Sequence, residues 1–99
     1  MFITSENPDS LEILIEVKSL DASNALELKN LLKDLDLKGK DRLVLNLKNI
    51  EFIDSSGIGA LLSIYKQYNQ NVSLKQPTSP VLSVLELLRL HRIFEIESG

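Results

Sequence analysis

The sequence contains 99 residues, with 11 lysines and arginines, 14 aspartates and glutamates, one histidine and no cysteine. This length is typical of one compact domain, so we expect a single domain over residues 1–99. A net charge of −3 gives no general attraction to nucleic acid, and a chain without cysteine has no disulfide or thiolate metal site. No run reaches the ~18 consecutive apolar residues of a membrane span, and the N-terminus lacks the pattern of a signal peptide, so we expect a cytoplasmic protein.

The N-terminal third of the chain predicts a strand followed by a helix. Residues 11–17 alternate apolar and polar side chains, the pattern of a strand with one buried face, and residues 2–3 add a short edge strand before the polar stretch at 5–10. A helix is predicted over residues 23–37, because Asp21 offers a capping oxygen, apolar residues recur along one face and a glycine follows.

The middle of the chain predicts a buried strand that leads into a second helix. Residues 43–47 are almost continuously apolar, as expected for a central parallel strand covered on both faces. The chain then leaves Phe52 and Ile53 and enters a helix near Ser56, in which apolar residues follow a helical spacing until residues 69–71 end it.

The last third predicts a strand at residues 72–74, a third helix over 81–90 with Pro80 in its first turn, and a final strand at 93–96. Strands and helices thus alternate along the chain with short connections. This order predicts an α/β domain with a mainly parallel, mixed sheet of four or five strands and helices packed against it.

The most informative segment is residues 49–59, which places two hydroxyls and two glycines where a strand passes into a helix. Ligands and partners of parallel sheets gather at the carboxyl ends of strands. Asp54 and Ser55 can cap the helix start, while Gly57 and Gly59 leave room for a phosphate or a partner's backbone. From the residues alone, a plainer interpretation is favoured, in which the segment is only a helix cap with turn glycines.

A resemblance to a known family favours the functional interpretation of this segment. Residues 43–67 are similar to the signature region of the STAS family of anti-sigma factor antagonists: LVLNLKNIEFIDSSGIGALLSIYKQ. The family pattern is an apolar strand, a Phe-x-Asp-Ser-Ser-Gly-[Leu/Ile]-Gly turn and an apolar helix. The order of elements also matches, and Leu20–Asp21 and Ser79–Pro80 resemble two further family turns. The resemblance implies the STAS fold for the whole chain.

The resemblance also implies a function and a site. The serine that is phosphorylated in the family corresponds to Ser55, with Ser56 as the alternative. The implied partners are an ATP-binding anti-sigma factor serine kinase and a PP2C-type phosphatase, with no cofactor, metal, nucleic acid or membrane involved and with a homodimer left open. The residues expected to contact the partner are Asp21, Asp54, Ser55, Ser56, Gly57, Ile58 and Gly59.

The chain departs from the family at two points. Ser19 stands where a glycine is usual in the turn before Asp21. The chain also stops soon after its last strand, where many members add a C-terminal helix, so we expect an uncovered edge or apolar face.

Two other function classes were weighed. A STAS scaffold or adaptor of a stress-sensing or lipid-transport complex would bind its partner constitutively, without a phospho-switch. An enzyme is disfavoured, because the chain offers one histidine, His91, no cysteine and no carboxylate cluster with metal spacing.

Two helices carry residues with open roles. The third predicted helix is apolar on more than one face, so it is either wedged into the core or a contact surface for a partner or a second copy. On the second helix, Tyr65 and Tyr68 are interpreted as packing residues, whereas Lys66 and Gln67 are predicted to face outward, where they could touch the kinase.

Overall fold

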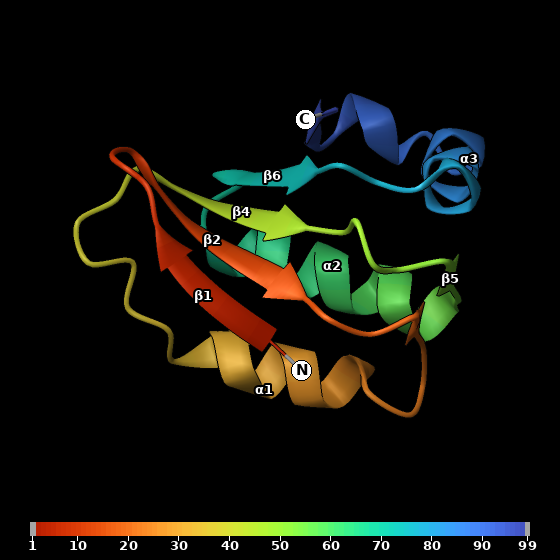
Figure 1. Ribbon diagram of the computed structural model, residues 1–99, viewed down its shortest axis with the longest axis horizontal. Helices are drawn as coiled ribbons and strands as arrows, with labels where there is room; N and C mark the ends of the chain where they lie inside the picture. The colour runs from red at the N-terminus through yellow and green to blue at the C-terminus, as the bar shows by residue number, and fades with distance from the viewer. Residues whose placement is uncertain (1, 99) are drawn as a thin grey trace.

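The computed structural model describes residues 2–98, which form one mixed five-stranded sheet, a two-stranded ribbon and three α-helices (Figure 1). The sheet order is β1-β2-β4-β6-β7, in which β1 is antiparallel to β2 and the other neighbours are parallel. The α/β fold class predicted from the sequence is therefore confirmed. The elements are β1 (Phe2–Glu6), β2 (Ser10–Ile15), β3 (Ser19–Leu20), α1 (Ala25–Lys33), β4 (Arg42–Asn46), β5 (Phe52–Ile53), α2 (Ser55–Gln67), β6 (Val72–Lys75), α3 (Ser79–Leu87), the 3₁₀ turn η1 (Leu90–Arg92) and β7 (Glu95–Glu97).

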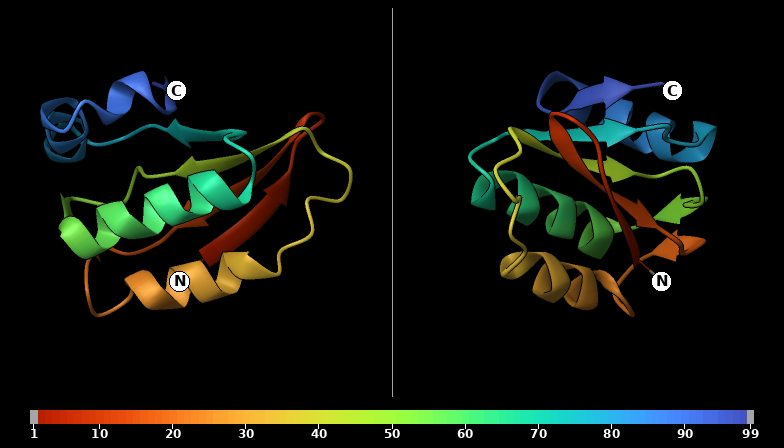
Figure 2. Two further views of the ribbon diagram at one scale, coloured as in Figure 1. Left: turned by 180° about the vertical axis from the view of Figure 1, so that it is seen from behind. Right: turned by 60° about the vertical axis from the view of Figure 1, so that its left-hand side comes forward.

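The helices cover one face of the sheet. Helices α1 and α2 lie side by side behind it, and α3 lies beyond the end of β6, next to the β3–β5 ribbon (Figures 1 and 2). Alternate residues of β2, β4 and β6 point toward the helices and are fully or almost fully buried. The core of these strands consists of Leu11, Ile13, Ile15, Leu43, Leu45, Val72 and Leu74.

Several predicted boundaries are wrong, for local reasons. Helix α1 ends at Lys33 rather than at residue 37, and a connecting loop follows in which Lys38 and Gly39 both have positive φ. The third helix runs over Ser79–Leu87 rather than 81–90, because Arg89 adopts a left-handed conformation with φ 60° that ends it. A conformation of this kind is rare outside glycine, so composition gave no signal for it.

The strand predictions at the two edges also need correction. Strand β1 covers residues 2–6 rather than only 2–3, because it pairs with β2 along its whole length. The turn of this hairpin lies within the polar stretch. Strand β2 ends at Ile15, and the final strand begins at Glu95 because the N–H groups of Ile93 and Phe94 donate to the Leu90 carbonyl in the preceding turn. The β3–β5 ribbon was not predicted as a pair, since two-residue strands have no periodicity to detect.

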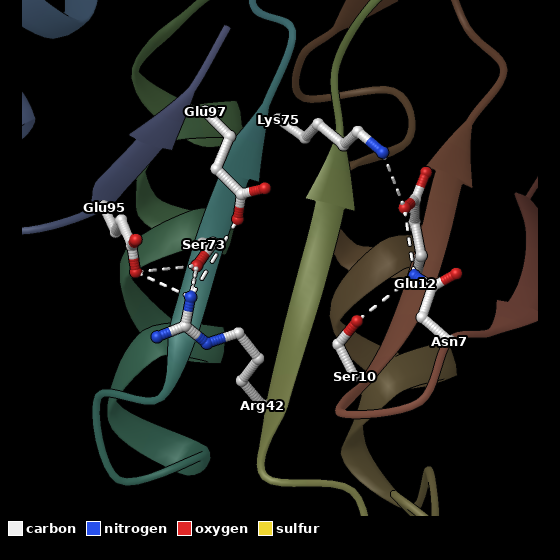
Figure 3. Close-up of polar contacts among 8 residues, drawn as sticks. All are labelled: Asn7, Ser10, Glu12, Arg42, Ser73, Lys75, Glu95 and Glu97. Atoms are coloured by element: carbon white, nitrogen blue, oxygen red, sulfur yellow. Dashed lines mark hydrogen bonds and ion pairs between the residues drawn. The ribbon is translucent and has the colours of Figure 1, made fainter. Parts of the chain in front are cut away.

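The face of the sheet that carries no helix within residues 2–98 is polar (Figure 3). Glu12 accepts hydrogen bonds from Asn46 and Lys75, both at 3.2 Å. Arg42 on β4 lies 2.6 Å from a carboxylate oxygen of Glu95 and 4.0 Å from one of Glu97, both on β7. These ion pairs link β4 to β7 across β6.

The central strand β4 is therefore buried on both faces, but differently from the prediction. Leucines meet the helices on one side, whereas Val44 and Asn46 are each only 4% exposed beneath charged neighbours on the other. The expected uncovered edge or apolar face does not lie on this side of the sheet but toward the end of the described residues, where β7 is an edge strand and Leu87 and Ile93 are 81% and 45% exposed.

The environment of Glu12 predicts acid sensitivity. Burial raises the pKa of Glu12, but hydrogen bonds from Asn46 and Lys75 and the charge of Lys75 outweigh it, so the pKa lies below the ordinary value of 4.5. A carboxylate with a lowered folded-state pKa stabilises the fold above its unfolded value, and that stability is lost as the pH falls through the folded value.

We predict that Glu12→Gln lowers the free energy of unfolding by ~1 kcal/mol at neutral pH and by less at about pH 3, because the contribution of the ionised carboxylate is lost as the pH falls through the folded pKa of Glu12. Urea denaturation across this pH range measures the effect, with Glu16→Gln at the exposed Glu16 as the matched control. An equal loss at both pH values would show that the ionised carboxylate does not contribute.

Candidate functional site

The β3–β5 ribbon brings together two aspartates that are far apart in the sequence. Leu20 pairs with Ile53 in parallel register, and the Asp54 N–H donates to the Leu20 carbonyl at 3.3 Å. Asp21 and Asp54 are the next residues on the two strands, and neighbouring strands lie ~4.8 Å apart. The carboxylates that the sequence analysis assigned to one site therefore share one rim at the carboxyl ends of the ribbon.

Asp54 shapes the start of α2. Its backbone is extended, with φ −109° and ψ −172°, and its carboxylate accepts a hydrogen bond from the Gly57 N–H at 3.0 Å. Its carbonyl accepts from the Ile58 N–H at 2.9 Å. This is the geometry of a helix N-cap, as predicted, and it makes Ser55 the first residue of the helix.

The two serines of the turn differ in exposure. Ser55 is exposed on the outer side of the first turn, whereas Ser56 is half-buried and lines a hollow that α2 forms with α1. An enzyme that modifies a hydroxyl must surround it, so the exposed Ser55 is the more accessible acceptor.

Gly57 has a structural role rather than an open surface. A Cβ at this position would overlap the Leu20 carbonyl oxygen and would lie 2.7 Å from Cγ1 of Ile53. The prediction that Gly57 leaves room for a partner is therefore wrong, because the room is filled by the protein's own ribbon. Ile58 is likewise 8% exposed and lies in the core.

Gly59 is different from Gly57. It is exposed, and a Cβ built on it would meet nothing within 4 Å. The fold does not need a glycine here, so its small size is available to an approaching molecule. Five of the predicted contact residues are therefore at least partly exposed. Ser55 and Gly59 are exposed, and Asp21, Asp54 and Ser56 are half-buried.

The loop at Asp21 is held by its own hydrogen bonds. The Ser23 hydroxyl and N–H both donate to one Asp21 carboxylate oxygen, and these bonds lower the pKa of Asp21 below its ordinary value, so the residue is charged at neutral pH. Asn24 donates to the Ser19 carbonyl at 2.8 Å and accepts from the Asp21 N–H at 3.0 Å. Ser19 does not adopt positive φ, so the missing family glycine leaves this loop intact.

The end of α2 corrects one prediction and confirms another. The Gln67 side chain is exposed, as predicted, but it is not free for a partner, because its amide donates to the Leu32 and Lys33 carbonyls at the end of α1, at 3.0 and 2.6 Å. Tyr68 also donates to the Leu32 carbonyl, and burial together with the charge of Asp34 raises its pKa. Tyr68 is therefore a packing residue, as predicted.

Tyr65 is also a packing residue, as predicted, since its ring lies edge to face against Phe94, with ring centroids 4.9 Å apart.

Helix α3 combines both interpretations that the sequence left open. Its Val81 and Leu85 are fully buried, whereas Leu87 and Leu88 are 81% and 50% exposed.

The sequence analysis missed two exposed apolar side chains near the site. Phe52 on β5 is 55% exposed and Leu26 on α1 is 63% exposed. Leu26 could have been found, because it falls outside the helical spacing of the buried Ala25 and Leu28. Phe52 gave no such signal, because a two-residue strand does not reveal which of its side chains faces inward.

No cluster of potential metal-ligating side chains occurs within residues 2–98, and His91 is exposed. No helix among these residues is both long and apolar enough to cross a membrane.

Comparison with known proteins identifies the fold family. Residues 4–99 match the model of the STAS domain. The chain belongs to the STAS domain family. An anti-sigma F factor antagonist from Paenibacillus polymyxa is 37% identical over 59 residues, a match that spans 57% of this chain and 50% of that protein. A Thermotoga maritima protein with a provisional name as an anti-sigma factor antagonist is 34% identical over 92 residues, 89% of this chain and 81% of that protein.

Solved STAS structures share the architecture. The anti-sigma factor antagonist SpoIIAA in its unphosphorylated form superposes with a TM-score of 0.74 at 16% identity, over 97% of this chain and 87% of that one. SpoIIAA of Bacillus in its phosphorylated form gives a TM-score of 0.69 at 17% identity, over 97% and 90% of the two chains. At this identity the likeness concerns the fold alone.

The two glycines of the STAS turn predict opposite effects of the same substitution. Gly57→Ala should lower the free energy of unfolding by about 1–3 kcal/mol, because the added methyl overlaps the Leu20 carbonyl. Gly59→Ala should leave it unchanged or raise it by up to ~1 kcal/mol, because alanine favours the helix and meets no neighbour. Urea denaturation of both variants tests this, and equal effects would contradict the packing described for Gly57.

Proposed function

We propose that this STAS domain is an anti-sigma factor antagonist that binds an anti-sigma factor serine kinase while Ser55 is unmodified and releases it when Ser55 is phosphorylated. The observation that carries the proposal is the exposed hydroxyl of Ser55 on a rigid helix start, with the carboxylates of Asp54 and Asp21 at the same rim. The names of the relatives support the same function.

The chemistry of the switch is a phosphoryl transfer. The Ser55 oxygen forms a bond to the γ-phosphorus of ATP, the bond to ADP breaks, and the hydroxyl proton passes to a base of the kinase. A PP2C-type phosphatase reverses the modification by hydrolysis. In this reaction the protein is a substrate, and none of its own residues needs to act as a catalyst.

The position of Ser55 explains why phosphorylation would leave the fold intact. A phosphate adds about −1.5 to −2 charges at neutral pH, and at the first residue of a helix this charge meets free N–H groups and the positive end of the helix dipole. Solved SpoIIAA structures exist in the phosphorylated and the unphosphorylated form, which is consistent with a fold that tolerates such a group.

The same charge would oppose binding. In a docked interface the phosphate would lie beside Asp54 and near Asp21, and a dianion buried without a positive partner costs several kcal/mol, where each ~1.4 kcal/mol is tenfold in affinity. Binding would thus be lost through electrostatics, without refolding.

A paired capture experiment tests the function. Ser55→Ala and Ser55→Glu proteins are used as baits in lysate from the source cells, and bound proteins are identified by mass spectrometry. We expect the alanine bait to retain an ATP-binding kinase that the glutamate bait loses, with an affinity difference of about tenfold or more. Ser56→Ala and Ser56→Glu test the alternative acceptor, whereas Ser5→Ala and Ser5→Glu, at an exposed serine of β1 outside the site, are the matched controls that should both retain the kinase.

If both Ser55 baits retain the same protein, the phospho-switch is contradicted and a constitutive STAS adaptor is the better account. If instead only Ser56→Glu loses the kinase, the acceptor is Ser56, and the assignment based on exposure is wrong.

A further inference from the structure

Helices α1 and α2 lie side by side (Figure 2), and a groove between them extends from the candidate site to the far end of both helices. It consists of two adjoining hollows of about 370 and 300 Å³, and Leu26 lines both. Its first hollow is lined by Ser56 and Gly59, so the groove begins one residue from the proposed phosphorylation site.

The groove is shallow on the α2 side and apolar on the α1 side. Gly59, Ala60 and Ser63 line it from α2, and the space above Gly59 is empty within 4 Å of a built Cβ. On α1, Leu26 remains 63% exposed. Small residues allow the backbone of another molecule to approach closely, and the exposed leucine gains by being covered.

Side-chain hydrogen bonds hold the groove open before any partner arrives. At one end, Gln67 and Tyr68 bind the last carbonyls of α1. At the other end, the packing of Gly57 on Leu20 fixes the start of α2. A preformed surface of this kind loses little conformational entropy on binding.

The charge of the groove indicates its occupant. Lys29 lines both hollows and Lys33 the second, and no carboxylate lines either of them. The wall is therefore basic, in contrast to the acidic rim at Asp21 and Asp54. The span from Ser56 to Gln67 is ~17 Å at the helical rise, which accommodates about three turns of another helix.

We infer that this groove binds an acidic amphipathic helix of the partner, with apolar side chains against Leu26 and Gly59 and carboxylates paired with Lys29 and Lys33. This reading rests on the proposed function for the identity of the partner as the anti-sigma factor. It also strengthens the switch, because a phosphate on Ser55 would stand at the mouth of a groove that holds a negatively charged helix. Helix-in-groove binding of this type is a common mode of recognition.

The test uses peptides, so that it does not depend on finding the kinase. A displayed library of helical peptides of about 16 residues is selected against the full chain, and the selected peptides are measured by fluorescence anisotropy. We expect leucine-containing peptides rich in aspartate and glutamate. Lys29→Glu and Gly59→Gln should each weaken them about tenfold, whereas Lys48→Glu, the same charge reversal at an exposed lysine outside the lining residues, should change binding less than about twofold.

Each other outcome overturns the inference. Failure to enrich any peptide, enrichment of basic peptides, or equal binding to the Lys29→Glu and wild-type proteins would show that the groove is not an acidic-helix site. Circular dichroism of each variant establishes that a loss of binding does not come from unfolding.

The captured kinase separates this inference from the proposed function. If the kinase distinguishes Ser55→Ala from Ser55→Glu but binds Lys29→Glu as tightly as wild type, the groove inference falls and the switch stands. If acidic peptides bind the groove while both Ser55 variants capture the same proteins, the groove stands and the switch falls.

Discussion

The contact between Gly57 and the Leu20 carbonyl is the constraint on which the rest of the site depends. It presses the first turn of α2 against the β3–β5 ribbon more closely than any side chain would allow. With α2 fixed there, Asp54 caps the helix beside the loop of Asp21, and Ser55 faces outward. The hydroxyl, the two carboxylates and the start of the groove are therefore positioned by backbone packing, and phosphorylation need not move them.

The surface around this contact has two parts of opposite charge. The ribbon end is acidic, and the groove between α1 and α2 is lined by lysines. A partner that covers both parts must match both signs, which favours specificity more than affinity. A phosphate at Ser55 would add negative charge at the boundary between the acidic ribbon end and the basic groove, where it acts on both parts.

The sequence predicted much of this arrangement, since the features concerned are local. The alternating pattern of residues 11–17, the apolar run at 43–47 and the turn around Asp54 each have a periodicity or a capping signal of their own. These signals were sufficient for the order of the helices and the longer strands and for the placement of Ser55 at a helix start.

The features that the sequence did not reveal depend on contacts between distant segments. Gly57 was interpreted as open space because nothing in the sequence indicates that the Leu20 carbonyl lies against it. Gln67 was interpreted as available to a partner because its own partners, the last carbonyls of α1, become neighbours only in the folded domain. The polar face of the sheet likewise needs the parallel register of β2, β4 and β6, which brings Lys75 to Glu12.

The central claim is that phosphorylation of Ser55 changes charge and not structure. The most direct measurement pairs two experiments on protein carrying phosphoserine at position 55: a ¹H–¹⁵N correlation spectrum and a calorimetric titration with the captured kinase. The account predicts amide shifts confined to the start of α2 and its neighbouring loops, together with a loss of affinity of about tenfold or more. Unchanged affinity, or shifts spread through the sheet, would contradict it.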